Sequence, residues 1–254
     1  MNRTSISDLK LKAKDQLLGN YGIATGSFAL LFVFIYTLIA IVMSAFTYTL
    51  RQDLYLGGTM TLAQDIEVSI IGIIIGAISV TFSVGYIQIM RKIALGEQPF
   101  ISDLFHVFKN HPDKVIIISL ILGGAQFILL LPATIVKSQV FGQTMNDFDA
   151  KNFLLWVILY LAGFIISFII DIMLALSFLI YLDDPSESVS HMVKTSVEMM
   201  KGNKFRYFYM LLSFIGYWAL GVLSCGLAFI WVVPYQTMTT VEFYLDLKGD
   251  VYEC

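Results

Sequence analysis

Polar side chains inside apolar segments are where this sequence could carry chemistry. Asp171 lies in the apolar run 153–182, and Gln126 lies in the run 115–136. An ionised carboxylate at mid-membrane costs about 3 kcal/mol on insertion scales, so it usually faces a bundle interior, water or a partner. Asp171, Gln126 and Gln236 are therefore candidates for an intramembrane polar site, in which Asp171 would carry a proton or bind a cation, although the structural interpretation given next is the one we favour. The alternative is a protonated or hydrogen-bonded Asp171 that fixes helix packing.

Other polar or special residues give weaker indications. Pro234 interrupts the last apolar run and predicts a kink that frees a backbone carbonyl one turn earlier. Glu242, near the end of that run, is expected to meet water or a nearby lysine. No spacing of histidine, cysteine and carboxylate residues is typical of a metal site. We expect Cys225 and Cys254 to be free thiols, and we expect neither a metal nor a cofactor.

Composition favours a membrane protein. Hydrophobic residues make up 57% of the chain, charged residues 14%, and the mean hydropathy is +0.78. Soluble domains average about 45–50% apolar and about 25% charged residues. The sequence lacks a phosphate-binding lysine loop, a HExxH zinc motif, a GxSxG elbow and a dinucleotide glycine fingerprint. These absences favour a protein that is not an enzyme, and nothing indicates nucleic-acid binding.

Six apolar runs are long enough to cross a bilayer, which takes about 20 residues. They are residues 22–50, 69–90, 115–136, 153–182, 205–223 and 227–245. Only Ser224-Cys225-Gly226 separates the last two, which predicts a very tight hairpin. The glycine pairs 22/26 and 72/76 have the spacing that lets membrane helices approach closely. The predicted fold class is all-α membrane: one integral membrane domain, 1–254, built as a six-helix transmembrane bundle.

Amphipathic helices are expected before the first, third and fifth runs. In the first, Ser5 and Asp8 have the spacing of a capping box, and the apolar stripe is Leu9, Ala13 and Leu17. The third has the stripe Val189, Met192, Val193, Val197 and Met200. An asparagine follows each helix, at positions 20, 110 and 203. This predicts three repeated units, 1–96, 97–184 and 185–254, each a cytoplasmic amphipathic helix plus a transmembrane hairpin. Parallel repeats of this kind suggest a pseudo-threefold ring.

Positive charge is distributed unevenly over the loops. If the six runs alternate, one set of loops contains only Arg51, Lys137 and Lys151, and all other lysines and arginines fall in the other set. The positive-inside rule then places both termini in the cytoplasm. Basic residues beside an anionic leaflet contribute about 1 kcal/mol each, so we expect inner-leaflet contacts at Lys10, Lys12, Lys14, Lys109, Lys201, Lys204 and Arg206. The same helices offer a docking face to a cytoplasmic or membrane protein partner.

Several segments resemble a known family. They are Leu17-Leu18-Gly19-Asn20-Tyr21-Gly22, Met200-Lys201-Gly202-Asn203-Lys204, Leu212-Ser213-Phe214-Ile215-Gly216-Tyr217-Trp218, Trp231-Val232-Val233-Pro234-Tyr235, and Phe243-Tyr244. Together they resemble domain-of-unknown-function family 975, multi-pass membrane proteins mostly of Gram-positive bacteria. The resemblance implies a fold and a location in the bacterial cytoplasmic membrane. It implies no reaction, substrate or catalytic residue.

Three classes of function follow from these observations. The first is a structural or accessory membrane protein that interacts with lipid or a partner protein through its cytoplasmic helices. The second is a small transporter or channel that uses Asp171 and the sixth span kinked at Pro234. The third, and the least favoured, is a membrane enzyme. A transporter predicts a polar cavity at the depth of Asp171, whereas an accessory protein predicts a closed bundle with conspicuous surface helices.

Overall fold

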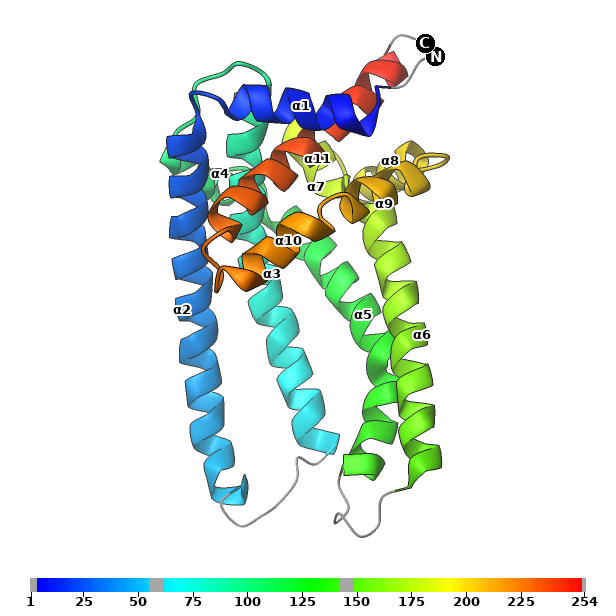
Figure 1. Cartoon of the computed structure of the whole chain (residues 1–254). Helices are drawn as coiled ribbons and strands as arrows, with labels where there is room; N and C mark the ends of the chain where they lie inside the picture. The colour runs from blue at the N-terminus through cyan, green and yellow to red at the C-terminus, as the bar shows by residue number, and fades with distance from the viewer. Residues whose placement is uncertain (1–3, 55–61, 142–148, 253–254) are drawn as a thin grey trace. The chain divides into compact units, whose positions relative to one another are not determined.

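The computed structural model describes residues 4–54, 62–141 and 149–252, and within these ranges it is helical, with no strand (Figure 1). Five stretches are long and apolar enough to cross a membrane: Tyr21–Ser44, Leu62–Ala94, Pro112–Lys137, Ala150–Asp183 and Lys204–Leu223. This confirms an all-helical chain with the composition of a multi-pass membrane protein. The sixth expected run, 227–245, is not among these stretches.

Four of these stretches are built on long helices. They are α2 (Tyr21–Leu54), α3 (Leu62–Ala94), α5 (Pro112–Phe141) and α6 (Ala150–Leu174), the last continued after a short break by α7 (Ser177–Asp183). The break matters because it frees the carbonyl of Met173, which accepts a hydrogen bond from the Ser196 hydroxyl at 2.9 Å.

The remaining elements are shorter. They are α1 (Ile6–Leu17), the 3₁₀ helix η1 (Ile101–Phe105), α4 (His106–Lys109), α8 (Val189–Met199), α9 (Lys204–Leu212), α10 (Ile215–Leu223) and α11 (Phe229–Tyr252). Asp65 and Glu67 fall between the apolar runs 22–50 and 69–90, where the sequence predicts a polar loop, but they lie inside α3. Residues 55–61 and 142–148 of the expected outer loops, and Cys254, fall outside the described residues.

The described chain forms two compact units. Unit 1 contains Met1–Phe34, Val80–Val115 and Ile172–Cys254, and unit 2 contains Ile35–Ser79 and Ile116–Asp171. Both units draw on the first two of the segments 1–96, 97–184 and 185–254, so the units cut across that division. The division into three segments stays a prediction.

Unit 1 has a buried core in which α1 lies across α11 (Figure 1). The largest side chains enclosed there include Tyr181, Phe214, Phe243 and Met90. The 3₁₀ helix η1 packs against the backbone of α3. A Cβ atom at Gly85 would lie 2.1 Å from the carbonyl oxygen of Leu104, so only glycine allows this approach.

Unit 2 has few buried side chains. Gly163 allows α6 to approach α5, since a Cβ there would lie 2.7 Å from the carbonyl oxygen of Leu129. Lys137 of α5 and Asp65 of α3 form an ion pair, with Nζ 2.8 Å from Oδ1. Exposed large apolar side chains cover this unit, including Ile128, Leu154, Ile158, Leu161, Phe164 and Ile165. Such a surface is typical of helices that face lipid.

The two glycine pairs, whose spacing leaves open whether they form packing seams, make no close helix contact in the described structure. No atom beyond the local helix lies within 4 Å of a Cβ built at Gly22, Gly26, Gly72 or Gly76. The spacing alone is a weak indicator because glycine is frequent in membrane helices. Close contacts are instead made by glycines outside such pairs, among them those at positions 85, 163 and 221.

Candidate functional site

Helix α1 is attached to the rest of unit 1 by an apolar face and by polar contacts on both sides of it. Leu9, Ala13 and Leu17 are buried, as the sequence predicts. The helix begins at Ser5, whose hydroxyl accepts a hydrogen bond from the Asp8 amide at 3.1 Å, which confirms this part of the expected cap. The Gln16 side-chain amide donates to the carbonyl of Ala94 at the end of α3.

Lys10 inserts its ammonium group among three aromatic rings. Its Nζ atom lies 4.1 Å from the ring centre of Phe214, 5.1 Å from that of Tyr217 and 5.9 Å from that of Tyr235. The ammonium donates to the Ser213 carbonyl and hydroxyl oxygens, both at 3.1 Å. Aromatic faces attract cations through the ring quadrupole. Burial lowers the pKa of Lys10 from its ordinary value, and the rings and Ser213 hold the ammonium in place.

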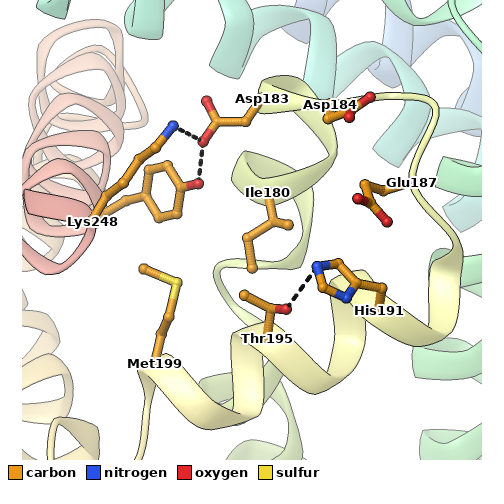
Figure 2. Close-up of a pocket in the computed structure, with 9 residues that line it drawn as sticks. Ile180, Asp183, Asp184, Glu187, His191, Thr195, Met199 and Lys248 are labelled. Atoms are coloured by element: carbon orange, nitrogen blue, oxygen red, sulfur yellow. Dashed lines mark hydrogen bonds and ion pairs between the residues drawn. The ribbon is translucent and has the colours of Figure 1, made fainter. Parts of the chain in front are cut away.

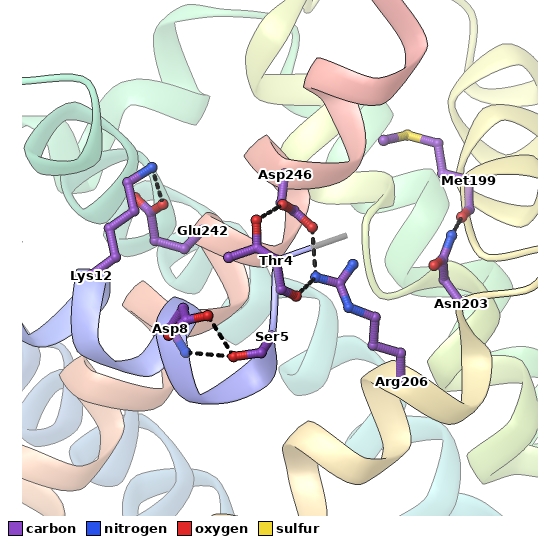
Figure 3. A network of polar contacts seen from close by, with 9 residues as sticks. All are labelled: Thr4, Ser5, Asp8, Lys12, Met199, Asn203, Arg206, Glu242 and Asp246. Atoms are coloured by element: carbon purple, nitrogen blue, oxygen red, sulfur yellow. Dashed lines mark hydrogen bonds and ion pairs between the residues drawn. The ribbon is translucent and has the colours of Figure 1, made fainter. Parts of the chain in front are cut away.

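Lys12 pairs with a carboxylate in the core. Its Nζ atom lies 2.6 Å from Oε2 of Glu242, whose side chain is 1% exposed (Figure 3). Among the described residues, neither oxygen of Glu242 accepts a hydrogen bond of good geometry. The prediction that Glu242 meets a nearby lysine is confirmed, but its position is buried and not at a water-facing helix end.

Arg206 joins three segments of unit 1. Its Nη2 atom donates to Asp246 Oδ2 of α11 and to the Thr4 carbonyl, both at 2.6 Å (Figure 3). The Thr4 hydroxyl also donates to Asp246. The guanidinium lies 4.9 Å from the ring centre of Phe243. The start of the described chain, α9 and α11 are therefore connected by one network of charge and hydrogen bonds.

The three asparagines singled out in the sequence make the same local hydrogen bond. The side-chain amides of Asn20, Asn110 and Asn203 each donate to the backbone carbonyl four residues earlier, at 3.1, 3.0 and 2.9 Å. Gly19 and Gly202, each just before its asparagine, adopt positive φ angles of 88° and 77°. At each site the bond closes the helix end that precedes an apolar segment.

The burial pattern around Asn20 and Asn203 is also the same. Side chains are buried three, seven and eleven residues before each asparagine, and four, seven and eleven residues after it. The first set is Leu17, Ala13, Leu9, Ala24, Ser27 and Leu31; the second is Met200, Ser196, Met192, Tyr207, Met210 and Phe214. The expected stripe of α8 is therefore correct at Met192 and Met200, with Ser196 buried between them instead of a valine.

Unit 1 also contains a cavity of about 240 Å³. It is lined by residues of α7, the following turn, α8 and α11: Ile180, Asp183, Asp184, Glu187, His191, Thr195, Met199, Tyr244 and Lys248 (Figure 2). Ile180 and Met199 supply an apolar wall, whereas the turn supplies carboxylates.

Asp183 holds one side of this cavity in place. Its carboxylate accepts from Arg91 of α3 at 2.6 Å, from Lys248 of α11 at 2.5 Å, and from the Tyr244 hydroxyl. Two cations neutralise this one carboxylate, so Asp183 connects α3, α7 and α11 and is fully engaged in structure.

The acidic groups of the turn are placed differently. Asp184 and Glu187 are exposed, and so is His191 on the neighbouring helix α8. Hydrogen bonds from the Ser186 hydroxyl and amide hold the pKa of Asp184 below its ordinary value, so it stays ionised. Beside an apolar wall, such carboxylates can receive a cationic group on an apolar stem, as in a lysine or arginine side chain. The described residues contain no group of three or more His, Cys, Asp or Glu residues placed to hold a metal ion.

The predicted intramembrane residues belong to two different units. Asp171 is exposed near the end of α6, and Gln126 is exposed on α5, both in unit 2. Gln236 belongs to unit 1, where its Oε1 atom accepts from the Trp218 indole at 2.6 Å. None of the three lines the cavity. Pro234 lies inside α11. The polar site and the kink both stay predictions.

The predicted inner-leaflet cations fall into two groups. Lys10, Lys12 and Arg206 are engaged within unit 1, as described above. Lys14, Lys109 and Lys201 are exposed, Lys204 is half-buried, and none of these four forms an ion pair with the described residues. Sequence reasoning treated all seven as equivalent because charge alone does not reveal which cations meet a carboxylate or a ring.

Comparison with protein-family models identifies a family. The family model described as "Protein of unknown function (DUF975)" matches residues 1–250. None of the curated proteins and none of the solved structures matches the chain.

Proposed function

The chain belongs to the DUF975 family, and from its geometry we propose that it is an accessory protein of the bacterial cytoplasmic membrane that binds anionic lipid at its cytoplasmic surface. The proposed protein crosses the bilayer several times, has both termini in the cytoplasm, and is not an enzyme. The five long apolar stretches support the membrane location.

The observation that carries this proposal is the division of the basic residues. Lys14, Lys109 and Lys201 are exposed and form no ion pair among the described residues, and one of them belongs to each helix or turn that ends at the three asparagines. Each lysine near an anionic surface contributes about 1 kcal/mol. Lys10, Lys12 and Arg206 instead attach α1, α9 and α11 to one another, so they support the surface that presents the exposed lysines.

The orientation is proposed from charge. All lysines and arginines except Arg51, Lys137 and Lys151 belong to loops and helices on one side of the alternating spans. The positive-inside rule makes that side cytoplasmic. An aromatic group at the N-terminal end of α6, on the proposed outer side, is formed by Phe153, Trp156 and Tyr160. Aromatic residues of this kind are typical of a membrane interface, which supports the proposed orientation.

Three repeated units, each an amphipathic helix followed by an apolar hairpin, are part of the same proposal. The shared asparagine hydrogen bond and the matching burial around Asn20 and Asn203 support it. A repeat would present at least one exposed lysine per unit toward the same leaflet. Three weak contacts together bind more strongly than one, because after the first contact the others are already near the surface.

A protein partner is a further part of the proposed role. The cavity beside Asp184 and Glu187 supports it, since these carboxylates and the apolar side chains of Ile180 and Met199 suit a basic side chain of a partner. The alternative function, a small transporter or channel using Asp171, rests on one carboxylate in an apolar helix. No contact described for Asp171 favours it over the accessory role.

The lipid proposal is tested in nanodiscs of phosphatidylglycerol or phosphatidylcholine. We expect phosphatidylglycerol to raise the unfolding temperature of the natural chain, and the triple variant K14Q/K109Q/K201Q to lose most of that increase. The matched control is K151Q, which removes an exposed lysine on the proposed outer side. An equal increase for the triple variant and the natural chain would reject lipid binding by these lysines.

A further inference from the structure

The path of the C-terminal hairpin raises a separate question. It consists of α10, the turn at Ser224-Cys225-Gly226, and the first part of α11. By length and composition, Lys204–Leu223 is able to cross a membrane. The contacts at the open end of the hairpin determine how far it can reach.

The open end is fixed to α1. Lys10 contacts Ser213 and Phe214 before α10, Tyr217 within it, and Tyr235 on the returning helix. Ring contacts of Phe214 and Tyr217 with Tyr235, at 5.2 and 5.8 Å between centres, close this end. Helix α1 itself carries Asp8, Lys10, Lys12, Lys14 and Asp15, so it belongs at the water or headgroup level and not in hydrocarbon.

The remaining hairpin is too short to cross from that level. From Ser213 to Ser224 a helical path rises at most about 16 Å, and from Gly226 back to Tyr235 about 14 Å, at 1.5 Å per residue. The hydrocarbon core of a bilayer is about 30 Å thick. The hairpin therefore reaches about halfway through the core, and the reach of one lysine side chain does not close the difference.

The tip is built for an apolar surrounding. Val222, Leu223 and Leu227 are strongly exposed, and Cys225 is exposed between them. The backbone amides of residues 224–232 all donate within the hairpin: eight to carbonyl oxygens, and that of Ala228 to the Ser224 hydroxyl at 2.9 Å. The same hydroxyl donates to the Gly221 carbonyl at 3.0 Å. A loop in water does not need this, whereas a donor without an acceptor in lipid costs several kcal/mol.

The two arms of the hairpin are packed closely together. A Cβ at Gly221 would lie 2.0 Å from the ring of Phe229. The Gly226 amide donates to the Gly221 carbonyl at 2.8 Å, and the Cys225 amide donates to the Val222 carbonyl at 3.1 Å. This pair of bonds is the Schellman ending of a helix, and it reverses the chain within a few residues.

We propose that α10 and the start of α11 form a re-entrant hairpin whose tip, at Ser224-Cys225-Gly226, lies among the acyl chains of the cytoplasmic leaflet. The chain enters and leaves on the same side, and Lys10 sets its depth. Lipid hydrocarbon surrounds the exposed apolar side chains of the tip. The proposal rests on the proposed cytoplasmic position of α1, but not on lipid binding by the exposed lysines.

This path leaves the charge asymmetry intact. Two crossings by the fifth and sixth runs, or none, return the chain to the same side. The lysines and arginines after residue 200 therefore stay with those of the N-terminus. Charge distribution cannot distinguish the two paths, but the position of the tip can.

Cys225 reports that position, because a C254S variant leaves it as the only cysteine. Intact cells and inverted membrane vesicles are treated with a membrane-impermeant maleimide. We expect labelling of Cys225 to be slower by at least roughly tenfold than labelling of the controls, because a charged, membrane-impermeant reagent is excluded from the acyl chains. Labelling after denaturation in detergent confirms that the thiol is intact. Two control variants, made in the C225S/C254S background, are D149C on the outer side and K201C on the inner side.

A second measurement distinguishes a thiol that lies among acyl chains from one that faces water but reacts slowly. A bimane probe attached to Cys225 in detergent is reconstituted with lipids carrying a quencher at defined depths. We expect the bimane fluorescence to be quenched most strongly by quenchers deep in the acyl chains. Rapid labelling of Cys225 from outside, or quenching mainly by aqueous iodide, would overturn it. The D149C and K201C controls test the orientation independently, so failure of the hairpin proposal and failure of the proposed orientation give different results.

Discussion

Lys12 of α1 and Glu242 of α11 form an ion pair with very unequal exposure: the carboxylate is 1% exposed and the lysine side chain 58%. The contact distance is 2.6 Å between Nζ and Oε2. An amphipathic surface helix thus supplies the counter-charge for a carboxylate inside unit 1. The docking of α1 and the stability of α11 are consequently coupled.

Replacing Lys12 should lower the free energy of unfolding more than replacing Glu242, whose charge it neutralises. We expect K12A to lower the free energy of unfolding by about 1–3 kcal/mol, because it leaves a buried carboxylate unpaired. E242Q should cost less, and K12A/E242Q should cost no more than E242Q alone. Equilibrium unfolding in mixed micelles measures all three variants. If K12A lowers the free energy of unfolding no more than E242Q does, the ion pair does not attach α1 to α11.

The aromatic site of Lys10 gives a second prediction. K10M keeps the apolar stem but removes the cation, so we expect a loss of about 1–2 kcal/mol and faster proteolytic cleavage within α1. K14M is the matched control, because Lys14 is exposed one turn further along the same helix. Cleavage followed by mass spectrometry measures both. Equal cleavage rates in K10M and K14M would show that the rings do not anchor α1.

Gly221 and Gly216 lie on the same helix, α10, and provide an internal comparison. G221A places a methyl group 2.0 Å from the ring of Phe229, and we expect it to destabilise the hairpin by about 1–3 kcal/mol. At Gly216 nothing lies within 4 Å, so G216A should be neutral or stabilising by up to about 1 kcal/mol. Thermal unfolding in detergent distinguishes the two. A larger loss in G216A than in G221A would contradict the packing described here.

The asparagine bonds predict a graded effect. Replacing Asn20, Asn110 or Asn203 by alanine removes a hydrogen bond worth about 1 kcal/mol. The loss should be largest at Asn203, because its side chain is 4% exposed and water replaces a buried amide less readily than an exposed one. N152A serves as the control in the same unfolding experiment. A cost at N152A equal to that at N203A would argue against a specific role of the bond.

Much of the fold could be predicted from the sequence because it depends on local pattern. The apolar runs, the stripe at Leu9, Ala13 and Leu17, and the asparagine helix ends are all encoded within a few turns. The expected outer loops were too long, since α2, α3 and α5 continue into the segments that carry Asp65 and Lys137. A charged residue one turn inside a helix end looks the same in sequence as a residue in a loop.

The candidate site could not be predicted in the same way because it depends on contacts between distant segments. Lys10 and Phe214 are about two hundred residues apart in sequence, and no local spacing links them. The cavity beside Glu187 likewise needs α11, which is distant in sequence from the consecutive helices α7 and α8. The expected sixth span shows the same limit: apolar composition indicated a membrane segment, but its depth depends on the contact between α1 and the hairpin.

The most direct test of the account is the sidedness of two exposed positions, Glu67 on α3 and Lys194 on α8. E67C and K194C, each in the C225S/C254S background, are labelled with a membrane-impermeant maleimide in intact cells and in inverted membrane vesicles. The account predicts that E67C reacts only in intact cells and K194C only in inverted vesicles. Labelling of both positions from the same side would contradict it.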